Sequence, residues 1–550
     1  MRVLPVALLC ALALQAQVDA PLAPTPTYFR HHFSTPTGRV EIKAPVRLDE
    51  YVVGDHLELS LRSYLELVMA NNVDIEIQRL GVETQRNAIL RQYGIFDPTL
   101  TASFQNQRAK SQSSDILAGA ATLNNLTQPA TFNYSQRMQT GTQFTLGFAA
   151  SKTSNNNSFQ YFNPVISSSL SFGFTQPLLR NRGSYVTKLP ITIARSRLRQ
   201  SRYSLEDSTI RLLVTAENAY WNVILQRENL KVQEKGLENL GTQLKRNQRE
   251  LELGAISPLD IYNPQAQYEQ QRIQVIQARF FLIQAEDQLR RQMGADLDPR
   301  FRSFPLVLTE SPYIEAEGET FDREALVERA LGKRKDLRAQ IQALDIDDLA
   351  IKQSTNALRP DFSLTGSYSA SGRGGIYYPR ASSVAGTGIS STAALVPIPG
   401  GFGDALDQLF GLGFPTYALG LRLTLPIRDR AANANMADAL LNKKLDALRT
   451  RSLEQTVRQD VLNAITQVES SKASIEIAKV GVDLAQKMLD AEQKKYDLGT
   501  TTIFFVLDAQ TRLVNAQSVL VNNSVSYKRN ILTLLQRTGE LLESRGVIVQ

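Results

Sequence analysis

Few residues in this chain could support catalysis. Its histidines are His31, His32 and His56, and its single cysteine is Cys10. No helix would gather these side chains at the spacing of a metal site, and the sequence contains neither a phosphate-binding glycine loop nor a nucleophile elbow. Carboxylates are abundant but scattered over faces that the periodicity predicts to be solvated. We therefore expect no enzymatic activity and no cofactor.

The first residues predict export. The apolar run from Val3 to Leu14 follows Arg2 and precedes small residues, and it is too short to span a bilayer. We predict a signal peptide over residues 1–20, with cleavage after Ala16 or Ala20. Because Cys10 lies inside this segment, the mature chain would have no thiol and no disulfide.

Composition and charge exclude further classes. Hydrophobic residues make up 43% and charged residues 21% of the chain, which argues against both disorder and a polytopic helical membrane protein. The net charge is +7, and Arg195, Arg197, Arg199 and Arg202 form a basic cluster. This cluster has no interleaved aromatic residues, so we interpret it as the solvated face of a helix start and expect no nucleic-acid partner.

The chain is predicted to be an internal duplication. Each half contains a short helix, strands, a long helix, a glycine at a tip and a second short helix. The expected segments are an extended proline-rich region at 21–57, a first repeat at 58–322 with strands at about 97–176, a second repeat at 323–542 with strands at about 361–426, and a C-terminal tail at 543–550.

Long helices end at the two tips. The helical pattern from about Ile193 to Leu253 would form a rod of roughly 90 Å, and a similar pattern covers about 432–497. Heptad spacing within both patterns favours a coiled-coil wall in which the short helices lie alongside the long ones. After the first tip, Ser257 is expected to cap the next helix, and Pro264 is expected to bend it.

The strands alternate apolar and small polar residues. Phe144, Leu146 and Phe148 are an example, and polar loops at about 108–128 and 151–163 separate such segments. A water-soluble sandwich would show the same alternation. Strands that lie between polar loops and long rods in an exported chain favour an outer-membrane β-barrel. Four to six strands cannot close a barrel, so the chain must oligomerise, although the spacing does not set the number of copies.

Several motifs, in this order and duplicated, resemble the outer-membrane efflux proteins, the TolC-like channels. The resemblance extends from about Leu59 to Leu542. Its carriers are the strand endings Phe174-Thr175-Gln176-Pro177-Leu178 and Leu423-Thr424-Leu425-Pro426-Ile427, the helical Ala219-Tyr220-Trp221, and the second tip, Tyr496-Asp497-Leu498-Gly499-Thr500 through Leu507-Asp508-Ala509-Gln510.

This resemblance implies a mainly α fold with a membrane β-barrel: a homotrimer in the cell outer membrane whose barrel continues as a helical tunnel through the periplasm. It implies a passive path for efflux of small molecules, with a periplasmic adaptor, an inner-membrane transporter and outer-membrane lipid as partners. A type I protein-secretion channel and a periplasmic coiled-coil scaffold without a pore remain alternatives. The barrel would have about 12 strands, or 18 if the segment from Phe132 to Ala150 joins it as a hairpin.

The resemblance also implies a gate at the helical tips. Asp508 matches one of two aspartate rings of the family, whereas Phe505 occupies the position of the other, either as a hydrophobic ring or as a packed core residue. Thr501 replaces an arginine that braces the closed state in some relatives, and Tyr496 matches a closing position. The expected adaptor-docking residues are Gly254, Ser257, Pro258, Asp260, Gly499, Thr500 and Thr502.

Overall fold

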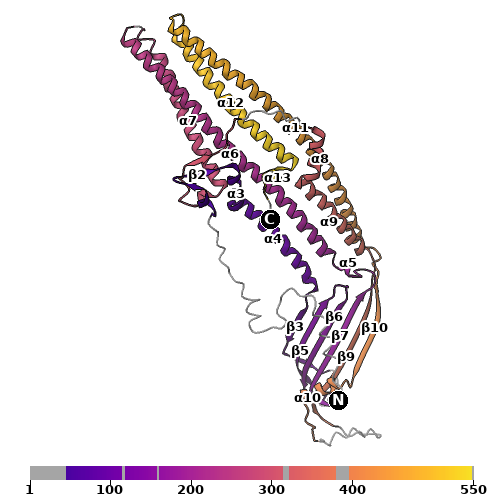
Figure 1. The fold of residues 1–550 in the computed structure, drawn as a ribbon. Coiled ribbons are helices and arrows are strands. Elements are labelled where there is room, and N and C mark those ends of the chain that lie inside the picture. Colours follow the sequence, from indigo (N-terminus) through magenta and orange to yellow (C-terminus); the bar gives the residue numbers. More distant parts are fainter. Residues whose placement is uncertain are drawn as a thin grey trace. The chain divides into compact units, whose positions relative to one another are not determined.

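The computed structural model describes residues 45–113, 118–157, 160–254, 256–313, 321–379 and 396–547. From Val46 onward the chain forms one compact unit (Figure 1). The expected signal peptide, the expected extended segment as far as residue 44 and the last three residues of the expected tail lie outside the described residues. Within the described part, no helix is both long enough and apolar enough to cross a membrane.

A large antiparallel sheet contains strands from both repeats. Its order is β10-β9-β7-β6-β5-β3, with β4 also paired to β5. The strands are β3 (Thr99–Phe104), β4 (Gln107–Gln112), β5 (Thr122–Arg137), β6 (Gln143–Asn155), β7 (Phe162–Pro177), β9 (Asp361–Tyr377) and β10 (Pro415–Thr424). The segments expected to be loops at about 108–128 and 151–163 therefore belong largely to strands, because backbone pairing continues beyond the apolar alternation.

Strands β3 and β4 occupy one position in this sheet. Phe104 pairs with Ala130 and Gln107 pairs with Thr127, so both strands follow the same register along β5 across the break at Gln105 and Asn106. The sheet therefore has six strand positions, four from the first repeat and two from the second. The hairpin that contains Phe132 is part of this sheet.

The register sorts the side chains onto two different faces. One row across the six positions contains Leu100, Tyr134, Leu146, Phe172, Tyr368 and Tyr417. The adjacent row, on the opposite face, contains Thr101, Asn133, Gly147, Ser171, Ser369 and Thr416. Leu100 is 71% exposed and Tyr417 is 82% exposed, so the apolar face has no protein cover at the sheet's edges.

The short helix α10 (Phe402–Phe410) covers part of the sheet beyond the end of β10. Its Ala405 and Leu409 are buried, and Ser168 Oγ on β7 donates a hydrogen bond to the Ala405 carbonyl oxygen at 2.7 Å.

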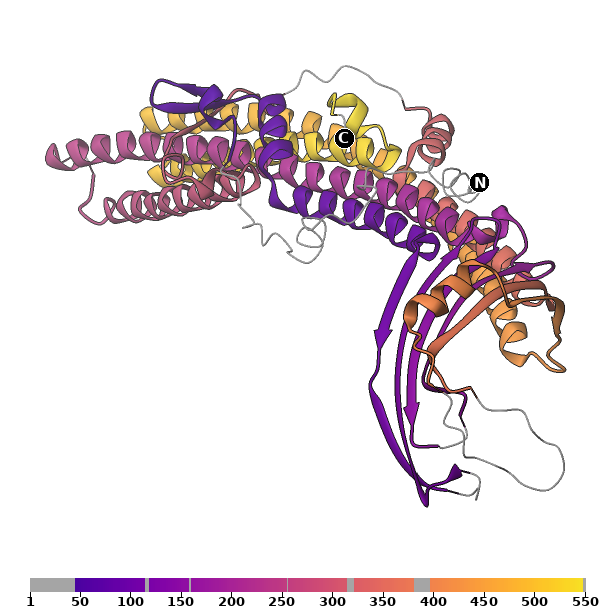
Figure 2. The same cartoon turned by 90° about the horizontal axis from the view of Figure 1, so that it is seen from below.

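The helices form a wall one helix thick that continues from the sheet (Figures 1 and 2). Its members are α4 (Val73–Tyr93), α6 (Leu189–Glu252), α7 (Tyr262–Gln292), α9 (Lys335–Ala357), α11 (Arg430–Asp497) and α12 (Ile503–Thr538). Near the sheet the contacting order is α4-α6-α9-α11, and towards the tips it is α7-α6-α12-α11. The 64 residues of α6 span about 96 Å.

Smaller elements pack against this wall and form its main core. They are the parallel pairing of β2 (His56–Leu59) with β8 (Leu306–Leu308), together with α3 (Leu61–Asn71) and α13 (Leu541–Ser544). A separate, second core joins α8 (Arg323–Lys333) to α11 and α12. Tyr64, Tyr220 and Leu289 are completely buried in the core that joins α3, α6 and α7. At its edge, Glu217 is 1% exposed and binds Arg545 through two hydrogen bonds, at 2.5 and 3.0 Å.

Candidate functional site at the paired helical tips

Each long helix ends at a glycine that the turn requires. Gly254 follows α6 and Gly499 follows α11, and both have a φ of +72°, a region that residues with a Cβ atom rarely adopt. At the second tip, the Gly499 amide donates to the Tyr496 carbonyl at 2.9 Å, and the Thr500 amide donates to the Lys495 carbonyl at 3.0 Å. These two bonds form a Schellman motif, which reverses the chain after α11.

The turn after the first tip differs from the expected helix start. Ser257, Pro258 and Asp260 form a non-helical turn, in which Asp260 Oδ2 accepts from the Ser257 amide at 3.3 Å. Helix α7 begins later, at Tyr262, so Ser257 is not its N-cap. Pro264 consequently lies in the first turn of α7, where no helical partner needs its missing amide hydrogen. The predicted bend inside this helix was therefore wrong.

Two side-chain pairs connect the tips. Tyr496 Oη on α11 donates a hydrogen bond to Glu250 Oε2 on α6 at 2.8 Å. Arg246 Nη1 lies 2.7 Å from Asp497 Oδ1, and its guanidinium carbon lies 5.4 Å from the Tyr496 ring centroid. We call Arg246, Glu250, Tyr496 and Asp497 the tip clasp. It joins the two hairpins of one chain.

The clasp is electrostatically matched at neutral pH. Burial and the hydrogen bond to Glu250 raise the pKa of Tyr496 to about 12, so its hydroxyl remains a donor. Hydrogen bonds from Arg246 and then Gln493 lower the pKa of Asp497. Because the folded-state pKa is depressed, the Arg246–Asp497 contribution is fully present above the ordinary aspartate pKa of about 3.9. It is lost as pH falls through the depressed value.

We expect the double variant Arg246→Gln/Tyr496→Phe to loosen the tips. The Tyr496–Glu250 hydrogen bond contributes about 1 kcal/mol, so its loss alone should raise the open fraction about fivefold, and the loss of the Arg246–Asp497 pair should add to this. Single-channel recordings should therefore show a higher mean conductance than for the unaltered protein. Acidification below about pH 4 should have the same effect on the unaltered protein and less effect on the double variant. Identical conductance in both proteins would exclude a closing role for the clasp.

Three of the four residues expected to form the gate, Thr501, Phe505 and Asp508, follow the second tip, whereas Tyr496 precedes it. Thr502 is the N-cap of α12, Thr501 is half-buried beside it, and the side chain of Phe505 is 52% exposed. Phe505 therefore is not packed in the core of the single chain. Asp508 Oδ2 lies 2.7 Å from Arg512 Nε, one turn along the same helix. Both side chains are partly exposed, so the aspartate keeps access to solvent.

The tips also expose apolar side chains. Leu253 and Leu259 of the first tip and Leu498 of the second are each at least 75% exposed. The expected docking residues Gly254, Ser257, Pro258, Asp260, Gly499, Thr500 and Thr502 lie around them, all on the surface. Exposed leucines among polar turn residues are suited to contact another protein.

Sequence reasoning did not identify Arg246, Glu250, Asp497 or Arg512 as site residues. Each forms an ordinary ion pair or hydrogen bond one turn along its own helix, a pattern that surface helices commonly show. The contact between hairpins depends on which helical faces meet at the tips. The one sequence signal for this contact between hairpins is that acidic and basic residues recur just before both tip glycines.

The two lateral edges of the wall bear unpartnered apolar stripes. On α7 the stripe consists of Ile273, Ile276, Phe280 and Ile283, and on α11 it consists of Ile477, Val480, Leu484 and Met488. All eight side chains are at least 46% exposed. Both stripes begin about three turns from their tip and cover about three turns, at steps of three and four residues. They therefore lie at the same height on opposite edges.

The large sheet, the long helical wall and the paired tips together are the architecture of the TolC-like outer membrane efflux proteins. The model of the outer membrane efflux protein family matches residues 105–295 and 326–540, and the chain belongs to this family. The chain is 27% identical to the outer membrane protein TolC of Escherichia coli K12 over 339 residues, which are 60% of this chain and 62% of TolC. It is 23% identical to TolC of Vibrio cholerae over 68% of this chain and 77% of that protein.

Solved structures agree with this fold. The outer-membrane channel CmeC of Campylobacter jejuni aligns with a TM-score of 0.60, covering 88% of this chain and 86% of CmeC at 15% identity. The expectation of a mainly helical fold with a membrane barrel is thereby confirmed. Family membership places the protein in the cell outer membrane, with its helical part in the periplasm.

Proposed function

We propose that this protein is the outer-membrane subunit of a tripartite export system. It would provide a passive tunnel across the periplasm for efflux of small molecules, together with a periplasmic adaptor and an inner-membrane transporter. The observation that carries the proposal is the open sheet: its exposed apolar face suits lipid, and its β10 and β3 edges carry unpaired backbone groups that lipid does not tolerate.

Further copies of the chain would complete this sheet. The apolar stripe on α7 of one copy matches the height of the stripe on α11 of the next, and β3 would similarly adjoin β10. Such a head-to-tail interface closes into a ring, and the family implies three copies. Six strand positions in each of three copies give 18 strands, the larger of the two numbers that the sequence left open.

The second tip would act as the gate. In a ring of three chains, Asp508 would place three carboxylates around the axis, where they attract cations, while Arg512 would partly compensate their charge. Phe505 and Tyr496 would narrow the same entrance, and the surface around Gly254, Pro258 and Gly499 would receive the adaptor.

We expect Asp508→Asn to lower the cation-to-anion permeability ratio and Arg512→Gln to raise it, because the pair contributes opposite charges to one constriction. Reversal potentials across a planar bilayer with a KCl gradient measure both changes. Asp483→Asn is a matched control, since Asp483 pairs with Lys487 at the same spacing and distance but away from the tips. Unchanged cation-to-anion selectivity in both tip variants would show that Asp508 does not line the gate.

Conductance separates the channel from the other candidates. Purified protein that inserts into a planar bilayer should give discrete conductance steps, whereas a periplasmic scaffold should give none. Crosslinking in intact cells, followed by identification of the adaptor and transporter, would distinguish a small-molecule efflux system from type I protein secretion.

A further inference from the structure

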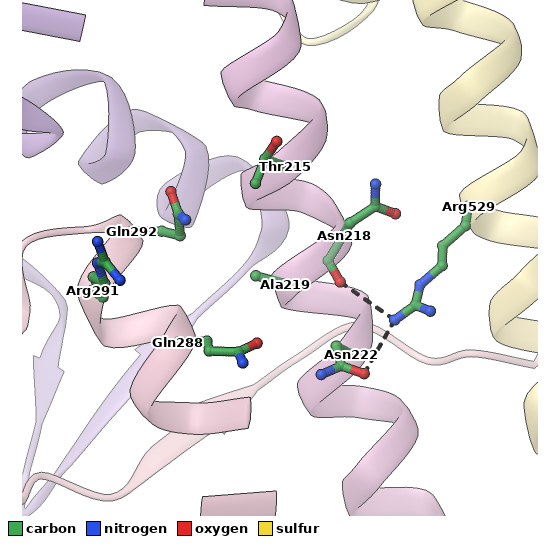
Figure 3. A pocket seen from close by; sticks show the side chains of 8 residues that line it. All are labelled: Thr215, Asn218, Ala219, Asn222, Gln288, Arg291, Gln292 and Arg529. Carbon is green, nitrogen blue, oxygen red and sulfur yellow. Dashed lines mark hydrogen bonds between the residues drawn. The ribbon is translucent and has the colours of Figure 1, made fainter. Parts of the chain in front are cut away.

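A polar groove lies halfway along the helical wall and away from the tips. It has a volume of about 500 Å³ and is formed on α6, between α7 and α12 (Figure 3). Its lining includes Thr215, Asn218, Asn222, Gln288, Arg291 and Arg529. Within the described part of the chain, its lining has two guanidinium groups and no carboxylate.

Among the residues that the structure describes, no carboxylate pairs with the charge of Arg529. It extends from α12 to α6, where its Nη2 donates to the Asn218 carbonyl at 3.4 Å and to Asn222 Oδ1 at 3.3 Å. Its Nε is buried and has no hydrogen-bond partner within the described part of the chain. Burial lowers the pKa of Arg529, and no neighbouring carboxylate opposes that shift. Arg529 is half-buried, and partial removal of a guanidinium from water without a counter-charge is unfavourable.

Arg291, on α7, is the second cation of the groove. Among the described residues, neither arginine forms an ion pair with a carboxylate, whereas the nearby Arg290 binds both Glu286 and Asp287. Thr215 on α6 and Gln288 on α7 add neutral hydrogen-bonding groups to the lining of the groove. This combination of donors and positive charge is suited to the oxygens of an anion.

The groove opens away from the elements that cover the wall. Tyr220 is buried on the covered side, where its hydroxyl donates to the Leu59 carbonyl at 3.1 Å. Thr215, Asn218 and Asn222 follow each other at helical spacing on the opposite face of α6. If the ring of the proposed channel closes with the covering elements outside, this face borders the tunnel.

We propose that the groove around Arg529 and Arg291 binds anions that carry carboxylate, phosphate or sulfate groups. Each copy of the chain contributes one groove, so the trimer has a belt of three anion sites on the inner wall. The trimeric belt rests on the proposed channel function, while anion binding by the groove does not. The belt favours passage of anionic solutes, in contrast to the acidic ring that Asp508 forms at the entrance.

Equilibrium dialysis of the purified full-length protein tests the site, with radiolabelled citrate and inorganic sulfate as separate probes. We expect saturable binding of one anion per chain. Arg529→Gln removes charged donors, each of which is worth about tenfold in affinity, and should weaken binding at least by that factor. Arg62→Gln is the control, because Arg62 is an exposed arginine on α3, on the covered side of α6.

Asn222→Asp provides a second test that keeps Arg529 in place. It puts a carboxylate where the Asn222 oxygen already accepts from Arg529, so the guanidinium acquires an internal counter-charge and the groove should lose anion binding. Binding that is unsaturable, or that survives in both groove variants, overturns the inference. Equilibrium dialysis measures anion binding without requiring a conducting channel. A protein that does not conduct could therefore still bind anions, and a conducting channel could lack the anion site.

Discussion

Replacing Ile276 by aspartate should leave the purified protein monomeric. Ile276 is in the middle of the apolar stripe of α7, and the proposed assembly buries it against α11 of the next copy at the height of Leu484. A carboxylate buried there without a partner costs several kcal/mol at each of the three contacts in a ring, which is more than an interface of this kind withstands. Size-exclusion chromatography with light scattering, on protein in detergent, measures the change.

The matched variants make this test specific. Gln270→Asp introduces the same charge at an exposed polar position of α7 outside the stripe and should leave the trimer intact. Leu484→Lys alone should also give monomers, whereas Ile276→Asp combined with Leu484→Lys should recover part of the trimer, because the two charges then face each other. Trimers formed by Ile276→Asp would show that the stripe faces something other than a second copy.

Replacing Arg545 by alanine should destabilise the folded chain by about 3 kcal/mol. Glu217, its partner across 328 positions of sequence, is buried and also accepts a hydrogen bond from Trp221 Nε1 at 3.3 Å. Without Arg545 the carboxylate would remain in the core as an unpaired charge, and breaking a buried pair in this way costs about 3–5 kcal/mol. Denaturant titration followed by circular dichroism, at fixed protein concentration, measures the loss.

Lys333→Ala provides the comparison. Lys333 pairs at 2.6 Å with Glu543, which is two residues before Arg545, but the side chains of Lys333 and Glu543 are both substantially exposed. Exposed pairs contribute about 0–1 kcal/mol, so this variant should unfold at nearly the original denaturant concentration. The double variant Glu217→Gln/Arg545→Met should recover much of the stability lost in Arg545→Ala, since no charge is then buried. An equal effect of Lys333→Ala and Arg545→Ala would contradict this account.

The sequence was most informative where local chemistry decides the structure. The φ of +72° at Gly254 and Gly499 follows from glycine at the end of a long helical pattern, so both tips could be located from sequence. Residues Phe144 to Phe148 alternate strictly, and they form a strand. The start of α7 was misplaced because Ser257 and Asp260 interact with each other in a turn, as such residues do equally well without a following helix.

Contacts between segments that are distant along the chain could not be predicted from the sequence. The spacing of Arg246 and Glu250 indicates a pair on one helix, and nothing in it shows that Tyr496 and Asp497 lie opposite. Arg529 in the sequence is one arginine among many. Its importance comes from the absence of a carboxylate around it, which depends on three helices that are far apart along the chain. The membership of the β5–β6 hairpin in the large sheet depended in the same way on pairing partners.

The β5–β6 hairpin affects the diameter of the proposed barrel. Six strands spaced about 4.8 Å apart and tilted by about 40° occupy an arc of roughly 38 Å. Four helices side by side at about 9.5 Å occupy the same arc, whereas four strands would cover only about 25 Å. In the proposed trimer the barrel and the tunnel would thus have matching circumferences, and a solute that has passed the tips would meet no narrowing of the wall where helices give way to strands.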